Sequence, residues 1–170
     1  MALPPLTLRE PTQRVSQQAP AYWRVSAGIG AAFLWLGAVA LLVTAVLVPG
    51  GWWSVLLWLG VVVLAVAPVP GLTVAPRIRY DVHRWEITDI AVHVRYGWLS
   101  RTDEIVPLSR VQTVDSTQGP LMRLFGLRTV TVQTASRAGT VAIACLDDAV
   151  AQGVVARLVA ITAATPEDAT

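Results

Sequence analysis

Residues 107–127, with the sequence PLSRVQTVDSTQGPLMRLFGL, carry the densest local pattern in this chain of 170 residues. The short run from Val111 to Thr117, which is followed by turn residues, predicts a β-strand. Gly119-Pro120 then interrupts the pattern, and such a pair is typical of the start of a short helix, here formed by LMRLFG. The stretch therefore predicts a strand followed by a helical turn.

The residues upstream of this stretch predict a β-hairpin. A two-residue turn at Thr88-Asp89 would pair Ile87 with Ile90, and would lead back through a second strand. Side chains on successive strand residues point to opposite faces. One face then collects apolar side chains and the other polar ones: Trp85, Ile87, Ile90, Val92, Val94, Tyr96 and Trp98 against Arg84, Glu86, His93 and Arg95.

Further strands and a last helix complete the predicted domain. The strands cover residues 101–107, 127–134 and 140–145, with a turn at 136–139. Asp147 is placed as the N-cap of the helix, whose apolar stripe is Val150, Val154, Leu158 and Ile161. Six or seven antiparallel strands and one helix fit a strongly bent sheet or partly open small β-barrel, capped by the helix.

The first half of the chain predicts two membrane-spanning helices. Residues 25–48 are uncharged and would form a helix about 36 Å long, enough to cross a hydrocarbon core of about 30 Å. Pro49-Gly50-Gly51 breaks this helix, and residues 52–74 supply a second apolar run. Pro68 and Pro70 predict a bend or early exit near its end. The chain is thus expected to be an α+β membrane protein with an N-terminal transmembrane hairpin.

Arginines flank the two spans and are missing from the loop between them, which predicts an orientation. Three arginines precede the first span and three follow the second: Arg9, Arg14, Arg24, and Arg77, Arg79, Arg84. Both termini are therefore expected in the cytoplasm, with the hairpin in the inner or plasma membrane. The long polar segment ahead of the first span argues against a cleaved signal peptide. We expect a disordered tail at 1–24, the hairpin at 25–75, the β domain at 76–164 and a tail at 165–170.

Several function classes find no support in the sequence. The net charge of +2 gives no basis for a nucleic-acid partner. The single Cys145 is expected in the core, and His83 and His93 fall on opposite hairpin faces, so no metal site is expected. The side chains of Asp103 and Glu104 are expected on opposite faces of a strand, so the two carboxylates could not act together as a general acid and base. We therefore expect no enzyme and no cofactor.

The order of a two-helix hairpin, RYDVHRWEIT, the stretch from YGWLSRTDEI to TVTVQTA, and a final helix resembles the bacterial PH-domain membrane proteins of the YdbS-like group. The resemblance covers residues 25–160. Its sharpest part is an ordered string: Pro107, Arg110, Val111, Gln112, Val114, Gln118, Gly119, Pro120, Leu121, Arg123, Leu124, Phe125, Gly126 and Leu127. The resemblance implies a cytoplasmic PH-like domain on a membrane hairpin, acting with a larger membrane protein that carries similar domains, and implies no reaction.

The residues of this string have a structural and a functional interpretation. In the structural one, Gln112 and Gln118 tie down the backbone around Gly119-Pro120, apolar residues pack the barrel, and the arginines pair with nearby acids. The residues expected to be mainly structural are Pro107, Gln112, Gln118, Gly119, Pro120, Leu124, Phe125 and Gly126. The residues expected to pack the barrel are Leu121, Leu124, Phe125 and Leu127. The acids expected to pair with the arginines are Asp103, Glu104 and Asp115. In the functional one, Arg110, Arg123 and Arg128 form a basic surface facing the bilayer.

Three binding hypotheses follow. The first is a non-enzymatic, membrane-anchored scaffold that engages a companion membrane protein through an exposed strand edge or a groove beside the last helix. The second is recognition of anionic lipid by the arginines. The third is a small structural subunit of an envelope or transport complex, in which Gly28, Gly30 and Gly37 let the hairpin approach another helix closely. The sequence does not define an oligomeric state.

Overall fold

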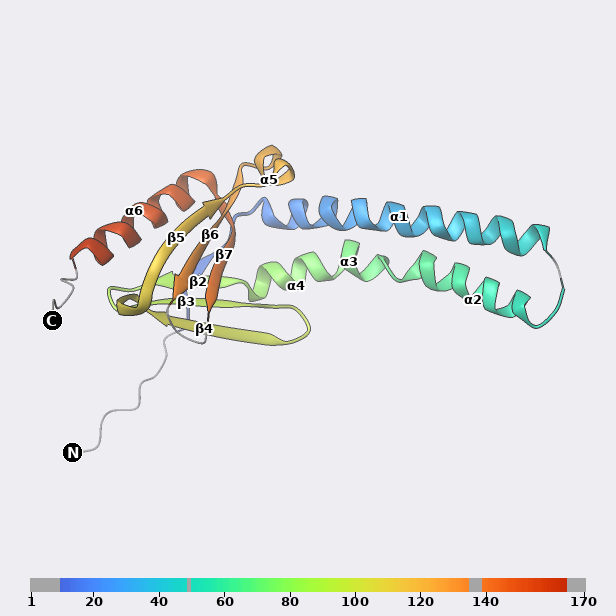
Figure 1. The fold of residues 1–170 in the computed structure, drawn as a ribbon, viewed down its shortest axis with the longest axis horizontal. Coiled ribbons are helices and arrows are strands. Elements are labelled where there is room, and N and C mark those ends of the chain that lie inside the picture. The colour runs from blue at the N-terminus through green and yellow to red at the C-terminus, as the bar shows by residue number, and fades with distance from the viewer. Residues whose placement is uncertain (1–9, 49, 135–138, 165–170) are drawn as a thin grey trace, which may run out of the picture. The chain divides into compact units, whose positions relative to one another are not determined.

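The computed structural model describes residues 10–48, 50–134 and 139–164. They form two units: a helical unit, Gln17–Tyr80, and a β-rich unit made from the residues up to Ser16 and those from Asp81 onward (Figure 1). The residues expected to form the turn at 136–139 and the tail at 165–170 lie outside the described residues, apart from Gly139.

Four helices follow one another through the helical unit. They are α1 (Ala19–Leu47), α2 (Trp53–Val66), α3 (Val69–Thr73) and α4 (Ala75–Val82), whose last two residues belong to the β-rich unit. Pro20 lies in the first turn of α1, where its missing N–H costs nothing. The helix α2 ends just before Pro68, so the interruption expected from the prolines is confirmed.

Small residues let α1 pack closely against α2 and α3. A β-carbon added at Gly60 would come within 2.6 Å of Leu41 Cδ2, and Trp35 Nε1 donates a 3.1 Å hydrogen bond to the Ala65 carbonyl. Close approach of this kind drives helix association in lipid, where there is no hydrophobic effect between helices. Three alanines at intervals of seven residues are buried along α1: Ala31, Ala38 and Ala45.

Two of the glycines expected to serve contacts with another protein are used inside this unit. A β-carbon at Gly28 would lie 3.8 Å from Leu72 Cδ2, and one at Gly37 would lie 3.7 Å from Leu64 Cδ1. Only Gly30, of these three, faces open space within 4 Å. The glycines of α1 therefore serve first the internal packing of the helical unit.

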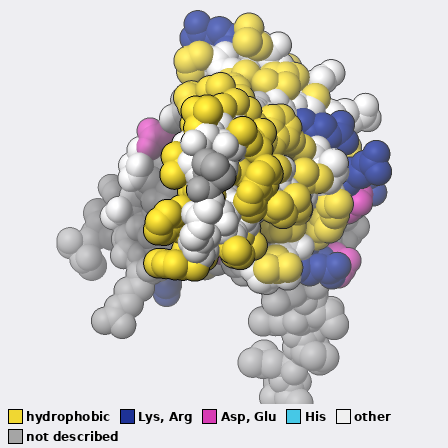
Figure 2. All heavy atoms as spheres, turned by 90° about the vertical axis from the view of Figure 1, so that its right-hand side faces the viewer, with side chains coloured by type: hydrophobic (Ala, Val, Ile, Leu, Met, Phe, Trp, Pro, Cys, Tyr) yellow, Lys and Arg dark blue, Asp and Glu magenta, His cyan; other side chains and the backbone are white. Residues whose placement is uncertain are grey.

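The helical unit presents apolar side chains to its surroundings. Its two long apolar segments, Ala19–Leu47 and Trp53–Val82, have 29 and 30 residues and are long and apolar enough to cross a membrane. Only 17% and 6% of their most apolar windows are buried, whereas a core helix of a soluble protein is mostly buried. Figure 2 views the chain from the side of the α1–α2 loop, and hydrophobic side chains cover the nearest surface.

The β-rich unit contains two antiparallel sheets and a long helix. The first sheet has the order β1-β2-β3-β4 and the second β5-β6-β7. The strands are β1 (Gln13–Arg14), β2 (Arg84–Ile87), β3 (Ala91–Gly97), β4 (Arg101–Pro107), β5 (Val111–Thr117), β6 (Leu127–Thr134) and β7 (Thr140–Asp147). The helical elements are the 3-10 turn η1 (Leu108–Arg110), α5 (Pro120–Leu124) and α6 (Asp148–Ala164). The expected α+β fold class is confirmed.

The β2–β3 hairpin has a wider turn than expected. Ile87 pairs with Val92 rather than Ile90, because the Thr88 backbone N–H and hydroxyl both donate to the Ala91 carbonyl. A register shift of two residues leaves each side chain on its expected face. It does, however, move Ile90 into the turn, where the residue is 79% exposed. The expected inward position of Ile90 is therefore wrong.

The helix α6 packs on the second sheet, and a hydrophobic core lies between them. It contacts β5, β6 and β7, and the main buried residues are Leu127, Val130, Val132, Val141, Ile143, Leu146, Ala151, Val154 and Leu158. The expected stripe is wrong at Val150, which is 43% exposed, and Ala151 takes the inward position. Cys145 is buried as expected, and its positive φ of 57° marks the irregularity that lets both Cys145 and Leu146 face inward.

Residues 10–16, here called the N-terminal strap, belong to the β-rich unit. Arg14 pairs with Arg84 in the β1–β2 ladder, and Ser16 N–H donates to the Cys145 carbonyl at 2.9 Å. The strap therefore links the first sheet to the second. The expected disordered tail is wrong over residues 10–24, because β1 and the start of α1 occupy this segment; residues 1–9 lie outside the described residues. The strand β1 has only two residues, which is too short to show a periodic pattern of apolar side chains in the sequence.

Candidate functional site

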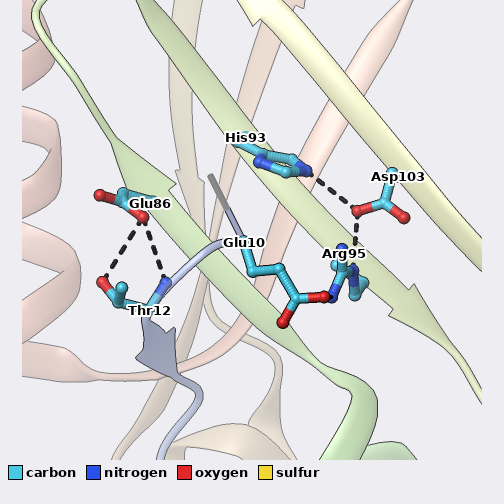
Figure 3. Close-up of polar contacts among 6 residues, drawn as sticks. All are labelled: Glu10, Thr12, Glu86, His93, Arg95 and Asp103. Atoms are coloured by element: carbon cyan, nitrogen blue, oxygen red, sulfur yellow. Dashed lines mark hydrogen bonds and ion pairs between the residues drawn. The ribbon is translucent and has the colours of Figure 1, made fainter. Parts of the chain in front are cut away.

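One face of the first sheet carries a network of charged and polar side chains. The ladder registers place Glu86 opposite His93 and Arg95 opposite Asp103, so side chains from three strands share one face. This is the polar hairpin face that the alternation of residues predicts. The N-terminal strap adds Glu10, so the network combines residues from distant parts of the sequence (Figure 3).

Asp103 is the centre of this network. Its Oδ1 accepts a 2.8 Å hydrogen bond from Arg95 Nε and lies 3.0 Å from His93 Nε2. Arg95 Nη1 donates a second bond to Glu10 at 3.1 Å. Arg95 thus bridges β4 and the N-terminal strap, as Figure 3 shows.

A second carboxylate holds the strap on β2. Glu86 accepts hydrogen bonds from the Thr12 backbone N–H at 3.2 Å and from its hydroxyl at 3.5 Å. Figure 3 shows the two groups facing each other. The strap is therefore fixed by side chains as well as by the β1–β2 ladder.

The network shifts the ionisation of its members. Burial disfavours the charged form of Asp103, but the hydrogen bonds from Arg95 and His93 outweigh burial and hold the pKa of the carboxyl below its ordinary value. The hydrogen bond to Asp103 raises the pKa of Arg95. The 2.7 Å hydrogen bond to Glu104, with burial, raises the pKa of Tyr96. Asp103 and Glu104 thus serve as hydrogen-bond acceptors for neighbouring side chains of the same sheet.

A pocket of about 240 Å³ opens beside this network. The residues that line it are Glu10, Pro11, Asp81, Val82, Arg84, Arg95 and Arg101. We call it the arginine pocket. It contains three arginines and two carboxylates, so its formal charge is +1. Such a lining favours a small anion over a cation or an apolar ligand.

Arg84, one of the residues that line the pocket, has an unmet hydrogen-bonding requirement. Its Nη1 is buried and has no hydrogen-bond partner among the described residues. Among the described residues, Arg101 forms no ion pair. Arg95, in contrast, forms ion pairs with Asp103 and Glu10. Buried polar groups in proteins almost always have partners, so an orphaned guanidinium N–H calls for an acceptor.

The three arginines expected to form a basic surface do not form one patch. Arg110 ends η1, before β5, whereas Arg123 and Arg128 follow the far end of β5, a strand of seven residues and so about 23 Å long. Arg128 is engaged by Asp148, with Nε to Oδ1 at 2.6 Å. This partner also differs from the expected Asp103, Glu104 or Asp115.

The motif residues have mainly local roles. Gln118 Nε2 donates to the Leu127 carbonyl at 2.9 Å, as the structural interpretation predicts. Gly119-Pro120 starts α5, and Gly126, with φ of 62°, ends the turn and accepts a hydrogen bond from Asp148 N–H. Pro107 ends β4, and Phe125 is half-buried.

Two motif residues lie at the surface. Leu124 is 82% exposed, so its expected packing in the barrel is wrong. It sits in the last turn of the five-residue helix α5, too short to turn every apolar side chain inward. Gln112 is exposed at the β5 irregularity, where no partner residue in β6 stands opposite it.

The remaining candidates give no chemical centre. Asp103 and Glu104 bind different partners, Arg95 and Tyr96. The helix α6 begins at Asp148, directly after the expected cap Asp147, which accepts from the Ser16 hydroxyl at 2.5 Å. Across the described ranges, no group of three or more His, Cys, Asp or Glu side chains is placed to hold a metal ion.

Sequence reasoning grouped Arg84 and Arg95 on one hairpin face but missed the pocket. The pocket also requires Glu10 and Pro11 from the strap and Asp81 from the end of α4. These segments are separated in the sequence by the whole helical unit. The available signal was the run of charges on that face, which alternation alone could not distinguish from a solvated surface.

Comparison with known proteins agrees with this architecture. The family model described as Bacterial PH domain matches residues 27–160. The UPF0699 transmembrane protein YdbS of Bacillus subtilis (strain 168) is 27% identical over 127 residues, which cover 75% of this chain and 79% of that protein. No solved structure matches with significance. The match spans most of the chain, including both apolar helices, and so this membrane-associated protein belongs to the bacterial PH domain family.

Proposed function

We propose that this chain is a membrane-anchored binding module whose β-rich unit holds a small anionic group, such as a phosphate ester, in the arginine pocket. The observation that carries the proposal is the buried, unpartnered Nη1 of Arg84. An unsatisfied buried donor costs about 1–3 kcal/mol, and rotation of the guanidinium toward an anionic oxygen in the pocket would remove that cost. The module acts by binding alone, in keeping with a family that is not an enzyme family.

Guanidinium chemistry supports a phosphate or carboxylate ligand. Arginine presents planar, fixed donors that match the oxygens of these anions, and such hydrogen bonds are stronger than neutral ones. Arg84 and Arg101 have donors to offer, whereas Arg95 shapes the wall through its bonds to Asp103 and Glu10. We therefore assign contact with the ligand to Arg84 and Arg101.

The test uses the full chain in phosphatidylcholine nanodiscs, titrated with inorganic phosphate or glycerol phosphate while thermal unfolding is followed. Binding at 100 times the dissociation constant stabilises a protein by about 2.7 kcal/mol. A second set of nanodiscs contains phosphatidylglycerol. Stabilisation by the soluble anions identifies a free-anion site, and stabilisation only by phosphatidylglycerol identifies a lipid headgroup. Neither effect in either arm refutes the proposal.

Two variants separate binding from structure. Arg101→Gln is expected to weaken binding about 10- to 100-fold, the loss of one or two hydrogen bonds to a charged group. Arg84→Met is expected to abolish the anion effect without lowering the melting temperature of the unliganded protein, because it removes an unsatisfied donor. Arg110→Gln, at the exposed end of η1, is the matched control and should leave binding unchanged.

We also propose that both termini face the cytoplasm from the inner membrane. The six flanking arginines and the uncharged α1–α2 loop support this orientation. A membrane-impermeant maleimide should label Gly50→Cys from outside intact cells and should label Thr88→Cys only after the cells are opened. Labelling of Thr88→Cys in intact cells would reverse the orientation.

A companion membrane protein is the second candidate partner, supported by the free edge of β4. The strand has seven residues and pairs, in the described part of the chain, only with β3. Its outer edge offers unpaired backbone groups, which suit the addition of a strand from another protein. Thr102→Pro and Thr113→Pro, one on β4 and one on β5, should be compared in a pull-down with a companion that carries PH-like domains. Equal recovery with both variants would exclude the β4 edge.

A further inference from the structure

The turn between β3 and β4 presents two large apolar side chains at a fixed tip. Trp98 and Leu99 follow Gly97 at the end of β3 and are 46% and 87% exposed. The expected inward position of Trp98 is thus wrong, because β3 ends one residue earlier. A β-carbon at Gly97 would lie 1.8 Å from the Ser100 carbonyl oxygen, so the turn is tight.

The position of this turn follows from the lining of the arginine pocket. Arg101, which directly follows the turn, lines that pocket together with Asp81 and Val82. Asp81 and Val82 are the last residues of α4, the end of the second membrane-capable segment. The β3–β4 turn therefore lies at the end of the β-rich unit that contains Asp81 and Val82, where the chain enters this unit.

The end of the helical unit carries residue types that are common at the membrane boundary. Arg77 is the first charged residue after the second apolar run, and Arg79 stacks on Trp23, with its Cζ 5.4 Å from the ring centroid. Tryptophan and arginine are typical of the membrane boundary. A helix rises about 1.5 Å per residue, so four residues of helix after a span that ends at Arg77 would cover about 6 Å, the depth of a headgroup layer about 5–8 Å thick.

We propose that Trp98 and Leu99 insert into the interfacial layer of the bilayer that anchors the chain. An indole ring prefers this boundary, leucine gains from burial in the acyl region, and Arg101 is placed to meet headgroup phosphates. The apolar helices already tether the β-rich unit to the membrane. Insertion of the turn therefore does not cost the translational entropy of bringing a separate protein to the bilayer, and two apolar side chains are enough for binding.

The chain offers a matched pair of positions to test this. Leu99 lies at one end of β3, and Ile90, which is 79% exposed, lies just before the other end. Single cysteines at these positions, in a Cys145→Ser background, carry a spin label on the full chain in phosphatidylcholine and phosphatidylglycerol vesicles. Collision with lipid-soluble oxygen and with a water-soluble nickel chelate then reports the depth of each label.

The label at Leu99→Cys is expected to collide more with oxygen than with nickel, and the label at Ile90→Cys the reverse. Equal nickel accessibility at both positions would overturn the proposal. A label at 99 that is immobilised and shielded from both reagents would indicate a protein contact and would also overturn it.

Two controls keep the test independent. If Cys145→Ser lowers the melting temperature, the native chain, whose Cys145 is 2% exposed, serves as the background instead. The anion titration of the arginine pocket does not involve Leu99, so the two proposals can fail separately.

Discussion

Gly97 fixes the geometry of the β3–β4 turn through its backbone alone. Its φ is 131°, a region that other residues rarely adopt, and any β-carbon would collide with the Ser100 carbonyl. We expect Gly97→Ala to lower the free energy of unfolding by about 2–4 kcal/mol, measured by thermal unfolding in nanodiscs. Gly153→Ala in α6, where a β-carbon meets nothing within 4 Å, is the control and should stabilise by about 0.5–1 kcal/mol. Similar effects at both positions would contradict this account.

Asp103 makes stability depend on pH. Its folded pKa lies below the unfolded value, so its contribution is fully present above about pH 4 and is lost as the pH falls through the folded pKa. Asp103→Asn removes this contribution. The difference in melting temperature between the two proteins should be largest near neutral pH and shrink in acid. A difference that stays constant or grows as the pH falls would show that the carboxylate charge is not what Arg95 and His93 stabilise.

The N-terminal strap is a structural element of the β-rich unit. Val15 is 5% exposed, whereas Gln13, two residues earlier, is exposed. Val15→Asp buries an unpaired carboxylate and should cost about 3 kcal/mol or more; Gln13→Asp should change stability by less than about 0.5 kcal/mol. Protease resistance of the β-rich unit measures both. Equal resistance would mean that the strap does not pack in solution.

The contact between α1 and α2 depends on small side chains. Ala38 is buried and Ala40, on another face of α1, is exposed. Ala38→Phe should separate the helices and lower the melting temperature in nanodiscs, while Ala40→Phe faces outward and should be tolerated. If Ala40→Phe is the more harmful change, α1 has a different face toward α2.

For the whole molecule, the helical unit is an insertion within the β-rich unit. The chain forms β1, passes through α1 to α4, and returns to form β2, which pairs with β1. Fragments 1–50 and 51–170, expressed together, should therefore co-purify through the strap and the α1–α2 contact. Val15→Asp in the first fragment should lower the recovery. Separate elution of the unmodified fragments would show that the covalent loop, rather than the packing, holds the parts together.

The sequence determined the elements of this protein because they depend on local periodicity. Uncharged runs long enough for a bilayer predict the two apolar segments, and short runs bounded by turn residues predict β4, β5 and β6 with their observed bounds. A period of two residues also predicts the faces of β2 and β3, whereas the predicted two-residue turn is wrong because the Thr88 hydrogen bonds widen it.

Where those elements meet depends on contacts between residues far apart in the sequence. The strap has too few residues for a readable pattern, and its partners in β2 and β7 lie 70 or more residues away. The arginine pocket exists because Glu10, Asp81 and Arg101 converge after the helical unit is inserted between them. Periodicity is a property of neighbours along the chain, whereas a pocket is a property of neighbours in space, and so the site came from the fold.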